Sequence, residues 1–96
     1  MPEARDPRYA RIAHVRLGAF NAPPGPWIRP AQADAEVSWT DGTWRPCTIV
    51  AWKRLDEPAE ELMSGAKVGW LVRLRMADGD DRWWGYRPAY LRPRRG

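Results

Sequence analysis

The sequence predicts a mainly β fold, a small barrel of about five short strands with a proline-rich N-terminal extension. Two turn signals, Asp41-Gly42 and residues 77–81 (ADGDD), separate runs in which apolar and polar residues alternate. Seven tryptophans in 96 residues bury a large area per side chain, which suits a barrel with little room for a core. We expect the barrel over residues 37–96 and an arm over residues 1–36.

Residues 1–20 contain two competing local signals. Asp6 and Pro7 have the chemistry of a helix N-cap and first helical position, and Gly18 suits the end of a helix. Residues 13–19, however, alternate between apolar and polar side chains, which is the spacing of a strand. Helix and strand are therefore both open for this segment.

Residues 21–33 (NAPPGPWIRPAQA) hold four of the ten prolines in the chain. Because proline fixes φ and disrupts regular structure, this stretch is expected to run extended over the surface. Trp27 is the side chain expected to dock it onto the domain.

A β-hairpin is expected from Val37 onward, because the Asp41-Gly42 dipeptide accepts the positive φ angles of a tight turn. Side chains in a strand alternate between two faces. On the second strand this alternation predicts one face with Cys47, Ile49 and Ala51, and the other with Thr48, Val50 and Trp52.

The loop between strands two and three, residues 54–67 (RLDEPAEELMSGAK), predicts a short helix. Asp56 can cap it, Pro58 lies near its start, and Gly65 follows its end. The next strand has the clearest alternation in the chain. Its predicted apolar face holds Val68, Trp70, Val72, Leu74 and Met76, and its other face holds Arg73 and Arg75.

The last strand is expected over residues 82–87 (RWWGYR), ended by Pro88 and followed by a short final piece. Because neighbouring side chains in a strand point to opposite faces, Trp83 and Trp84 cannot both lie in one core. One is expected to pack inward, and the other to face solvent or lie beneath the proline-rich arm. Trp84 and Tyr86 are expected to share a face.

Residues 82–96 carry five arginines and no acidic residue, so much of the net charge of +4 lies at this end of the chain. A basic patch of this kind attracts polyanions without identifying the partner. The alternative is a solvated basic end with no ligand.

The spacing VSWTDGTWRPCTIVAW, GWLVRLRM and YLRP resembles the Tudor and Agenet-like group of Src-homology-3-type small barrels. The matching positions, within residues 37–93, are Trp39, Asp41, Gly42, Trp44, Cys47, Ile49, Trp70, Val72, Leu74, Leu91, Arg92 and Pro93. The resemblance implies that fold, and it implies an aromatic cage for methylated lysine or arginine with Trp39 as one wall. Arg45 and Leu74 stand where such cages commonly have aromatic residues, so the implied cage is degenerate.

Residues that could carry chemistry are few. With one histidine and one cysteine, Cys47, the chain cannot form an internal disulfide or a Cys/His zinc site. The aspartates of residues 78–81 are expected to form a solvated turn. We therefore expect no catalytic residue, no metal, no cofactor and no small-molecule substrate. No apolar run of about 18 residues or secretory signal is present, so a cytoplasmic protein without a membrane is expected.

The expected function is a non-catalytic binding module, with protein–protein interaction or self-association through exposed aromatic residues and arginine as the first choice. The candidate ligand-binding residues are Trp39, Trp44, Trp83, Trp84, Tyr86 and Tyr90. The alternative is a nucleic-acid-binding module in which Trp83 or Trp84 stacks on a base and arginines contact phosphates. These arginines are Arg82, Arg87, Arg92, Arg94 and Arg95. A methyl-lysine or methyl-arginine reader is the second alternative.

Overall fold

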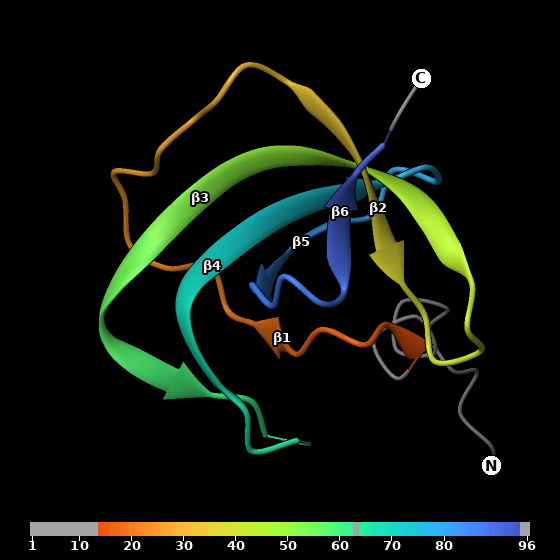
Figure 1. The fold of residues 1–96 in the computed structure, drawn as a ribbon. Helices are drawn as coiled ribbons and strands as arrows, with labels where there is room; N and C mark the ends of the chain where they lie inside the picture. Colours follow the sequence, from red (N-terminus) through yellow and green to blue (C-terminus); the bar gives the residue numbers. More distant parts are fainter. Residues whose placement is uncertain (1–13, 63, 95–96) are drawn as a thin grey trace, which may run out of the picture.

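The structure is a computed structural model that describes residues 14–62 and 64–94. In this part of the chain, antiparallel strands form one sheet in the order β1-β5-β4-β3-β2-β6 (Figure 1). The bounds are β1 Ala19–Phe20, β2 Ala33–Ser38, β3 Trp44–Glu60, β4 Lys67–Met76, β5 Asp81–Gly85 and β6 Leu91–Pro93. The mainly β class is confirmed, with six strands in place of about five. β1 and the start of β2 lie in the region expected to be an arm.

The predicted turn at Asp41-Gly42 joins β2 to β3. Gly42 has a φ of 86°, a conformation that glycine adopts without the penalty a Cβ brings. Asp41 Oδ1 accepts hydrogen bonds from the backbone N and the Oγ1 of Thr43, at 2.9 and 2.6 Å. These bonds lower the pKa of Asp41 to about 2 because they favour the ionised carboxylate. Turn chemistry read from the sequence therefore gives the correct hairpin.

β3 departs from the alternation expected for it. The pairing with β4 shifts between Ile49 and Ala51, so that Ile49 pairs with Leu74 while Ala51 pairs with Arg73. A bulge of this kind inserts one extra residue and reverses the faces that follow. Ala51 is therefore not on the face of Ile49, and Trp52 is, which corrects the expected arrangement.

The helix expected within residues 54–67 is also wrong. β3 continues to Glu60, and Ala59 and Glu60 pair with Val68 and Lys67 of β4. Pro58 lies where the register shifts between Arg54 and Ala59, a position where the missing N–H of proline does not interrupt the ladder. Cross-strand hydrogen bonds to β4 thus outweigh the local helix signals. Figure 1 shows β3 and β4 as two long neighbouring arcs that bend through the molecule.

The two faces of the sheet carry separate hydrophobic clusters. The first cluster contains Val15, Leu17, Ala35, Val37, Cys47, Val72, Leu74, Met76, Trp84 and Leu91. The second contains Ala51, Val68, Leu71 and Trp83. The expected apolar face of β4 is thus correct at its last three apolar positions, whereas Val68 belongs to the other cluster.

Trp83 and Trp84 lie on opposite faces, as expected from their adjacency in β5. Tyr86 packs against the same cluster as Trp84, which confirms that these two share a face. Trp83 lies beneath the proline-rich arm, where the ring of Trp27 is 5.1 Å from its own. The arm is further held by the Nε1 of Trp27, which donates a 2.8 Å hydrogen bond to the carbonyl of Pro23. The docking role of Trp27 is therefore confirmed.

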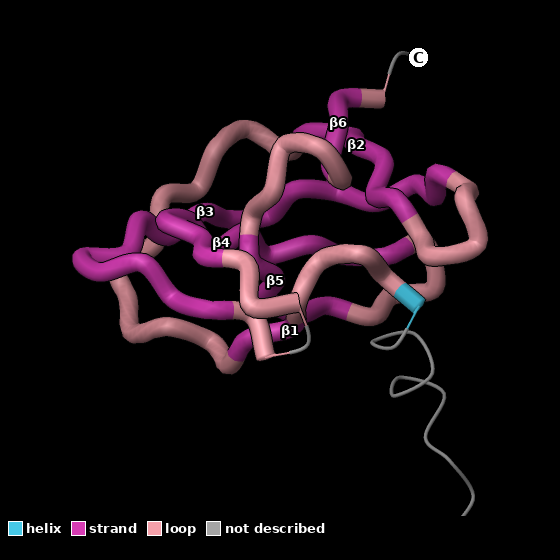
Figure 2. The backbone as a smooth tube through the Cα atoms, turned by 60° about the horizontal axis from the view of Figure 1, so that its bottom comes forward, coloured by secondary structure: helices cyan, strands magenta, loops and turns pink. Residues whose placement is uncertain are grey.

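Residues 14–20 contact two parts of the sheet that are far apart in the strand order. At one end Val15 bridges to Trp39, just beyond β2; at the other, Ala19 and Phe20 pair with β5. His14 is helical, residues 16–17 form a bend, and Val15 and Ala19–Phe20 pair with other segments, so the strand alternative holds at these last positions. The Asp6-Pro7 helix start lies outside the described residues. Figure 2 shows β2 and β6 on one side of the molecule, β1 on the other, and β3, β4 and β5 between them.

The buried carboxylate of Glu61 holds residues 14–20 in place through a hydrogen bond to Gly18. Glu61 is only 3% exposed and accepts hydrogen bonds from Gly18 N at 2.9 Å, Ser64 Oγ at 2.7 Å and Arg87 Nη1 at 3.1 Å. A Cβ at Gly18 would meet Glu61 Cγ at 2.8 Å, so a larger residue there displaces the carboxylate.

Among residues 14–62 and 64–94, no helix has the length and hydropathy that crossing a membrane requires.

Candidate functional site

Trp83 and Trp84 do not offer a surface to a ligand. Trp83 is 4% exposed and Trp84 is 0% exposed, because β5 lies between β1 and β4 and is covered on both faces. In this structure neither ring has the exposed face that stacking on a nucleic-acid base requires. Both indoles serve the packing of the domain.

Three other candidate rings are covered by arginine. The guanidinium carbons of Arg45 and Arg92 lie 3.9 Å from the ring centres of Trp39 and Trp44. Tyr90 lies beneath two guanidinium groups, with Arg87 at 4.6 Å and Arg16 at 5.5 Å. These are cation–π contacts made within the chain. The place where a ligand cation would sit on these rings is thus taken by the protein itself.

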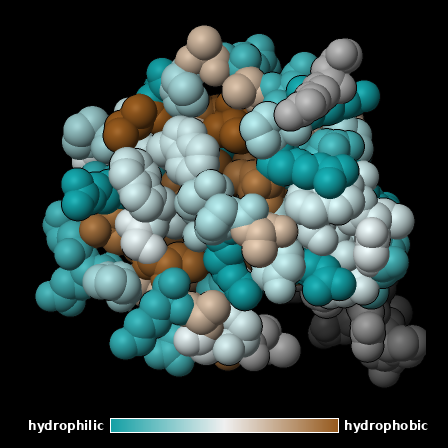
Figure 3. Space-filling view, viewed as in Figure 1, coloured by the Kyte–Doolittle hydropathy of each residue, from teal (hydrophilic) through white to brown (hydrophobic). Residues whose placement is uncertain are grey.

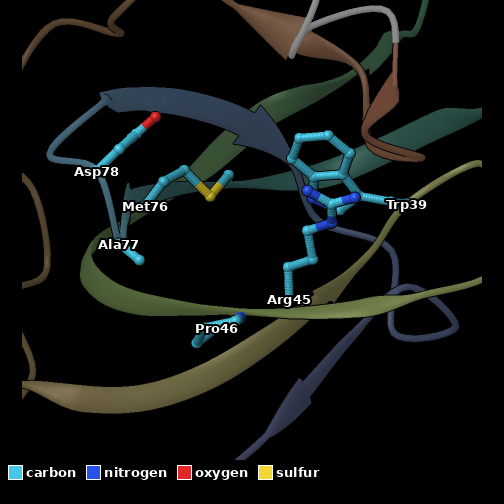
Figure 4. A pocket seen from close by; sticks show the side chains of 6 residues that line it. All are labelled: Trp39, Arg45, Pro46, Met76, Ala77 and Asp78. Atoms are coloured by element: carbon cyan, nitrogen blue, oxygen red, sulfur yellow. The ribbon is translucent and has the colours of Figure 1, made fainter.

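A small hollow of about 180 Å³ adjoins Trp39. Figure 4 shows the guanidinium of Arg45 lying against the Trp39 indole, with Met76 and Asp78 across the hollow. Arg45 is also held by Asp41, whose Oδ2 is 3.1 Å from Arg45 Nη2. His14 stacks on the Trp39 ring as well, with 6.3 Å between ring centres and 7° between planes. Trp39, the cage wall that the resemblance implies, is therefore in contact with Arg45 and His14.

The C-terminal arginines are held in ion pairs with carboxylates from different parts of the chain. Arg82 makes two hydrogen bonds to Asp80, at 2.8 and 3.0 Å. Arg87 pairs with Glu61 and Arg92 with Glu36, each at 3.1 Å. Arg94 is exposed, and Arg95 lies outside the described residues. Instead of one continuous basic patch, the described arginines are spread over several elements and partly neutralised.

The structure brings together a different set of aromatic residues. Ile28, Trp52, Trp70 and Tyr86 line a hollow of about 330 Å³, which we call the aromatic pocket. The Trp52 ring stands edge-on to Trp70, at 6.2 Å and 89°, and to Tyr86, at 5.0 Å and 82°. Edge-to-face packing is one of the favoured arrangements of aromatic rings.

Backbone hydrogen bonds hold the walls of the aromatic pocket in place. Ile28 and Trp52 exchange both of their backbone bonds, at 2.9 and 2.8 Å, so the proline-rich arm is fixed to the edge of β3. Tyr86 N donates to the carbonyl of Trp70 at 2.9 Å, which extends the β4–β5 pairing by one residue. The pocket is thus built on strands and on an arm that is tied to a strand.

The aromatic pocket is open to solvent. Ile28 is 56% exposed and Trp70 is 36% exposed. In the part of the chain that the structure describes, guanidinium groups lie over Trp27, Trp39, Trp44 and Tyr90, and none lies over Trp52, Trp70 or Tyr86. On the face of the molecule seen in Figure 3, hydrophobic residues reach the surface between paler and hydrophilic ones.

Sequence reasoning found only one wall of this pocket as a candidate, Tyr86. The alternation of β3 predicts the wrong face for Trp52, because the bulge after Ile49 leaves no clear mark in the sequence. The alternation places Trp70 on the apolar face of its strand, and Trp70 does lie on the pocket side, near the start of β4 and before the residues that β4 contributes to the first hydrophobic cluster. Ile28 lies in the proline-rich stretch, where no strand alternation indicates the direction of its side chain. The usable signal was the Trp84–Tyr86 parity, which places Tyr86 on one face of β5.

Groups with chemical reactivity are scarce in the described residues. Cys47 is buried, and burial together with the nearby charge of Glu36 raises the pKa of its thiol to about 12. The thiolate, which is the reactive form, is therefore suppressed at neutral pH. Within residues 14–62 and 64–94, no cluster of three or more histidine, cysteine or acidic side chains is arranged to hold a metal ion.

No protein-family model, curated protein or solved structure matches this chain. Its function is therefore inferred from its own residues and their contacts. Among the features described above, the aromatic pocket is the place where several aromatic rings meet solvent without an arginine over them.

Proposed function

We propose that this protein is a non-catalytic binding module whose aromatic pocket receives an apolar side chain of a protein partner. The observation that supports the proposal is the contrast among the aromatic rings. Trp39, Trp44 and Tyr90 carry arginines of the same chain, while the rings of the pocket remain accessible. Concave sites with apolar walls and exposed tryptophan are typical of interface centres.

We also propose that the sheet is a curled small barrel of the Src-homology-3 type, related to the Tudor and Agenet-like group. Two contacts support this. Arg16 N donates to Ser38 O at 3.0 Å near the β2 end, and Gly85 N donates to Gly18 O at 2.9 Å beside β5. One short segment therefore spans the distance between distant strands of the sheet, as it does when a sheet curls toward closure.

A protein partner fits the charges better than nucleic acid does. Tight nucleic-acid binding without sequence preference needs several phosphate contacts. Arg82, Arg87 and Arg92, which were expected to supply them, are in ion pairs with carboxylates. The partner is either another protein or a second copy of this chain, and light scattering over a range of concentrations separates these two.

The test uses N-acetyl-phenylalanine amide, an uncharged mimic of an apolar residue within a peptide. We expect it to bind with a Kd on the order of 1 mM, the range for a fragment of this size. Binding is followed by NMR through the indole Nε1–H signals of Trp52 and Trp70. Trp70→Ala removes an exposed wall of the pocket and is expected to abolish the shifts.

The matched control is Trp44→Ala, which removes a half-buried tryptophan beneath Arg92, outside the pocket. This variant is expected to bind the probe as the unmodified protein does. Shifts that persist in Trp70→Ala, or that centre on residues outside the pocket, would contradict the assignment of the site. A strong response to duplex or single-stranded DNA that weakens with salt would favour the nucleic-acid alternative.

A further inference from the structure

Arg54 is paired in the sheet with Trp70, a wall of the aromatic pocket. The pairing of β3 with β4 runs without interruption through Trp52 with Val72, Lys53 with Leu71, and Arg54 with Trp70. Residues directly opposite in an antiparallel pair project from the same face, with Cβ atoms about 5 Å apart. Arg54 therefore stands beside Trp70 on the pocket face, and it is exposed.

Arg54 also shares this face with Trp52. The two residues are two positions apart on β3, and no register shift separates them. The side chain of Arg54 thus leaves β3 on the face that carries both indoles. A guanidinium presents several N–H donors in a fixed planar fork, the geometry that matches a carboxylate.

The other cations of this region are turned away or held elsewhere. Lys53 Nζ lies 3.4 Å from the carbonyl of Pro26, which it reaches as a donor, and Arg29 lies over the ring of Trp27 at 5.4 Å. Arg87, next to Tyr86 in sequence, pairs with Glu61. Arg54 is therefore the cation that the strand register places on the pocket face.

Carboxylates are lacking in the pocket lining, which consists of one isoleucine and three aromatic residues. Along β3 the next acidic residue is Asp56, within the stretch where pairing with β4 is interrupted. An apolar floor with a cation at its rim repels a cationic guest and attracts an apolar group that has a negative charge beside it.

We infer that the aromatic pocket selects an acidic protein segment, in which an apolar or aromatic side chain enters the pocket and an adjacent carboxylate pairs with Arg54. This inference rests on the proposed function and adds the chemistry of the partner to it. A methylated cation is disfavoured by the positive rim. A nucleic acid is disfavoured because the C-terminal arginines are engaged by Asp80, Glu61 and Glu36.

Three matched probes test the inference on the full chain: N-acetyl-phenylalanine, N-acetyl-phenylalanine amide and phenylalanine amide. They share the phenyl ring and carry charges of about −1, 0 and +1 at about pH 6, which lies between the pKa of an α-carboxyl and that of an α-amino group. We expect the carboxylate to bind about two- to fivefold more tightly than the neutral amide, and the ammonium to bind more weakly than both. Raising the salt concentration is expected to shrink these differences.

Arg54→Glu is expected to reverse the order of the three probes, because the rim charge changes sign while the rings remain. The control is Arg29→Glu, which makes the same charge change on an arginine that lies over Trp27, and it is expected to preserve the order. Trp fluorescence and the NMR spectrum establish that both variants are folded. A reversal in Arg54→Glu alone assigns the charge preference to Arg54.

The outcomes separate the inference from the function beneath it. If the ammonium probe binds most tightly, or if Arg54→Glu leaves the order unchanged, the inference is overturned and the pocket remains a binding site. If none of the three probes shifts the Trp52 and Trp70 indoles, the proposed function fails with it. If thymidine 5′-monophosphate binds more tightly than N-acetyl-phenylalanine and loses binding in Arg54→Glu, a nucleotide replaces the acidic peptide.

Discussion

Two groups of aromatic rings in this domain differ in whether an arginine covers them. Trp39, Trp44 and Tyr90 lie under arginines of the same chain, whereas Trp52, Trp70 and Tyr86 form an open pocket. Each group contains two tryptophans and one tyrosine, and each includes one residue of β3. An arginine over a ring satisfies its π-face and covers its apolar surface. The comparison teaches that aromatic richness alone does not mark a recognition surface, because it is the uncovered rings that are available to a partner.

A fully buried ring should contribute more to the free energy of unfolding than an open ring that lies partly in solvent. Trp84→Ala empties the centre of the first hydrophobic cluster and is expected to lower the free energy of unfolding by about 3–5 kcal/mol. Trp70→Ala is expected to lower it by about 1 kcal/mol, since the ring is partly in solvent. Urea denaturation of both variants, followed by circular dichroism, measures the difference. Equal losses would mean that Trp70 is a core residue.

The second prediction concerns the ion pair that holds Arg87 over Tyr90. Glu61→Gln keeps the size of the buried side chain and removes its charge, leaving Arg87 with a weaker partner. We expect a loss of about 2 kcal/mol in the free energy of unfolding. The same substitution leaves a net charge one unit more positive, so nonspecific DNA binding at low salt is expected to rise slightly. Unchanged stability would show that Glu61 does not hold residues 14–20 in place.

The third prediction removes the cover of a ring. In Arg45→Ala the Trp39 indole becomes accessible on the side of the small hollow. We expect weak binding of tetramethylammonium at Trp39 in this variant and none in the unmodified protein. Shifts of the Trp39 indole signal report on it, and the Trp52 and Trp70 signals serve as the internal control. If Trp39 responds equally in both proteins, Arg45 does not block the ring.

The smallest expected effect is a pH dependence of stability that comes from Asp41, the carboxylate that also pairs with Arg45. The pKa of Asp41 is lowered to about 2 by its hydrogen bonds from Thr43, compared with about 3.9 for an unfolded aspartate. Its contribution to stability is therefore complete above about pH 4 and is lost as the pH falls toward 2. Urea denaturation of Asp41→Asn and the unmodified protein should give stabilities that converge over this range. A gap that stays constant with pH would contradict the role of the ionised carboxylate.

The comparison of rings also shows how far the sequence leads toward the site. Tyr86 was a candidate because its parity with Trp84 is local information. Trp52 was assigned to the wrong face because one bulge, at a position without glycine or proline, reversed the alternation. Arg54 belongs to none of the candidate sites that the sequence predicts. Its importance depends on its register with Trp70, and register between strands is set by packing over the whole sheet.

What the sequence determined by itself is local. The Asp41-Gly42 hairpin, the β4 strand and the opposite faces of Trp83 and Trp84 follow from turn chemistry and from the two-residue period of a strand.

Only the tertiary structure decided three other properties: that residues 54–60 extend β3, which rings lie beneath arginines, and that the aromatic pocket opens beside Arg54. Each depends on contacts between different segments of the folded sheet, and the free energy of such contacts outweighs the weak preference of a short segment for its own conformation.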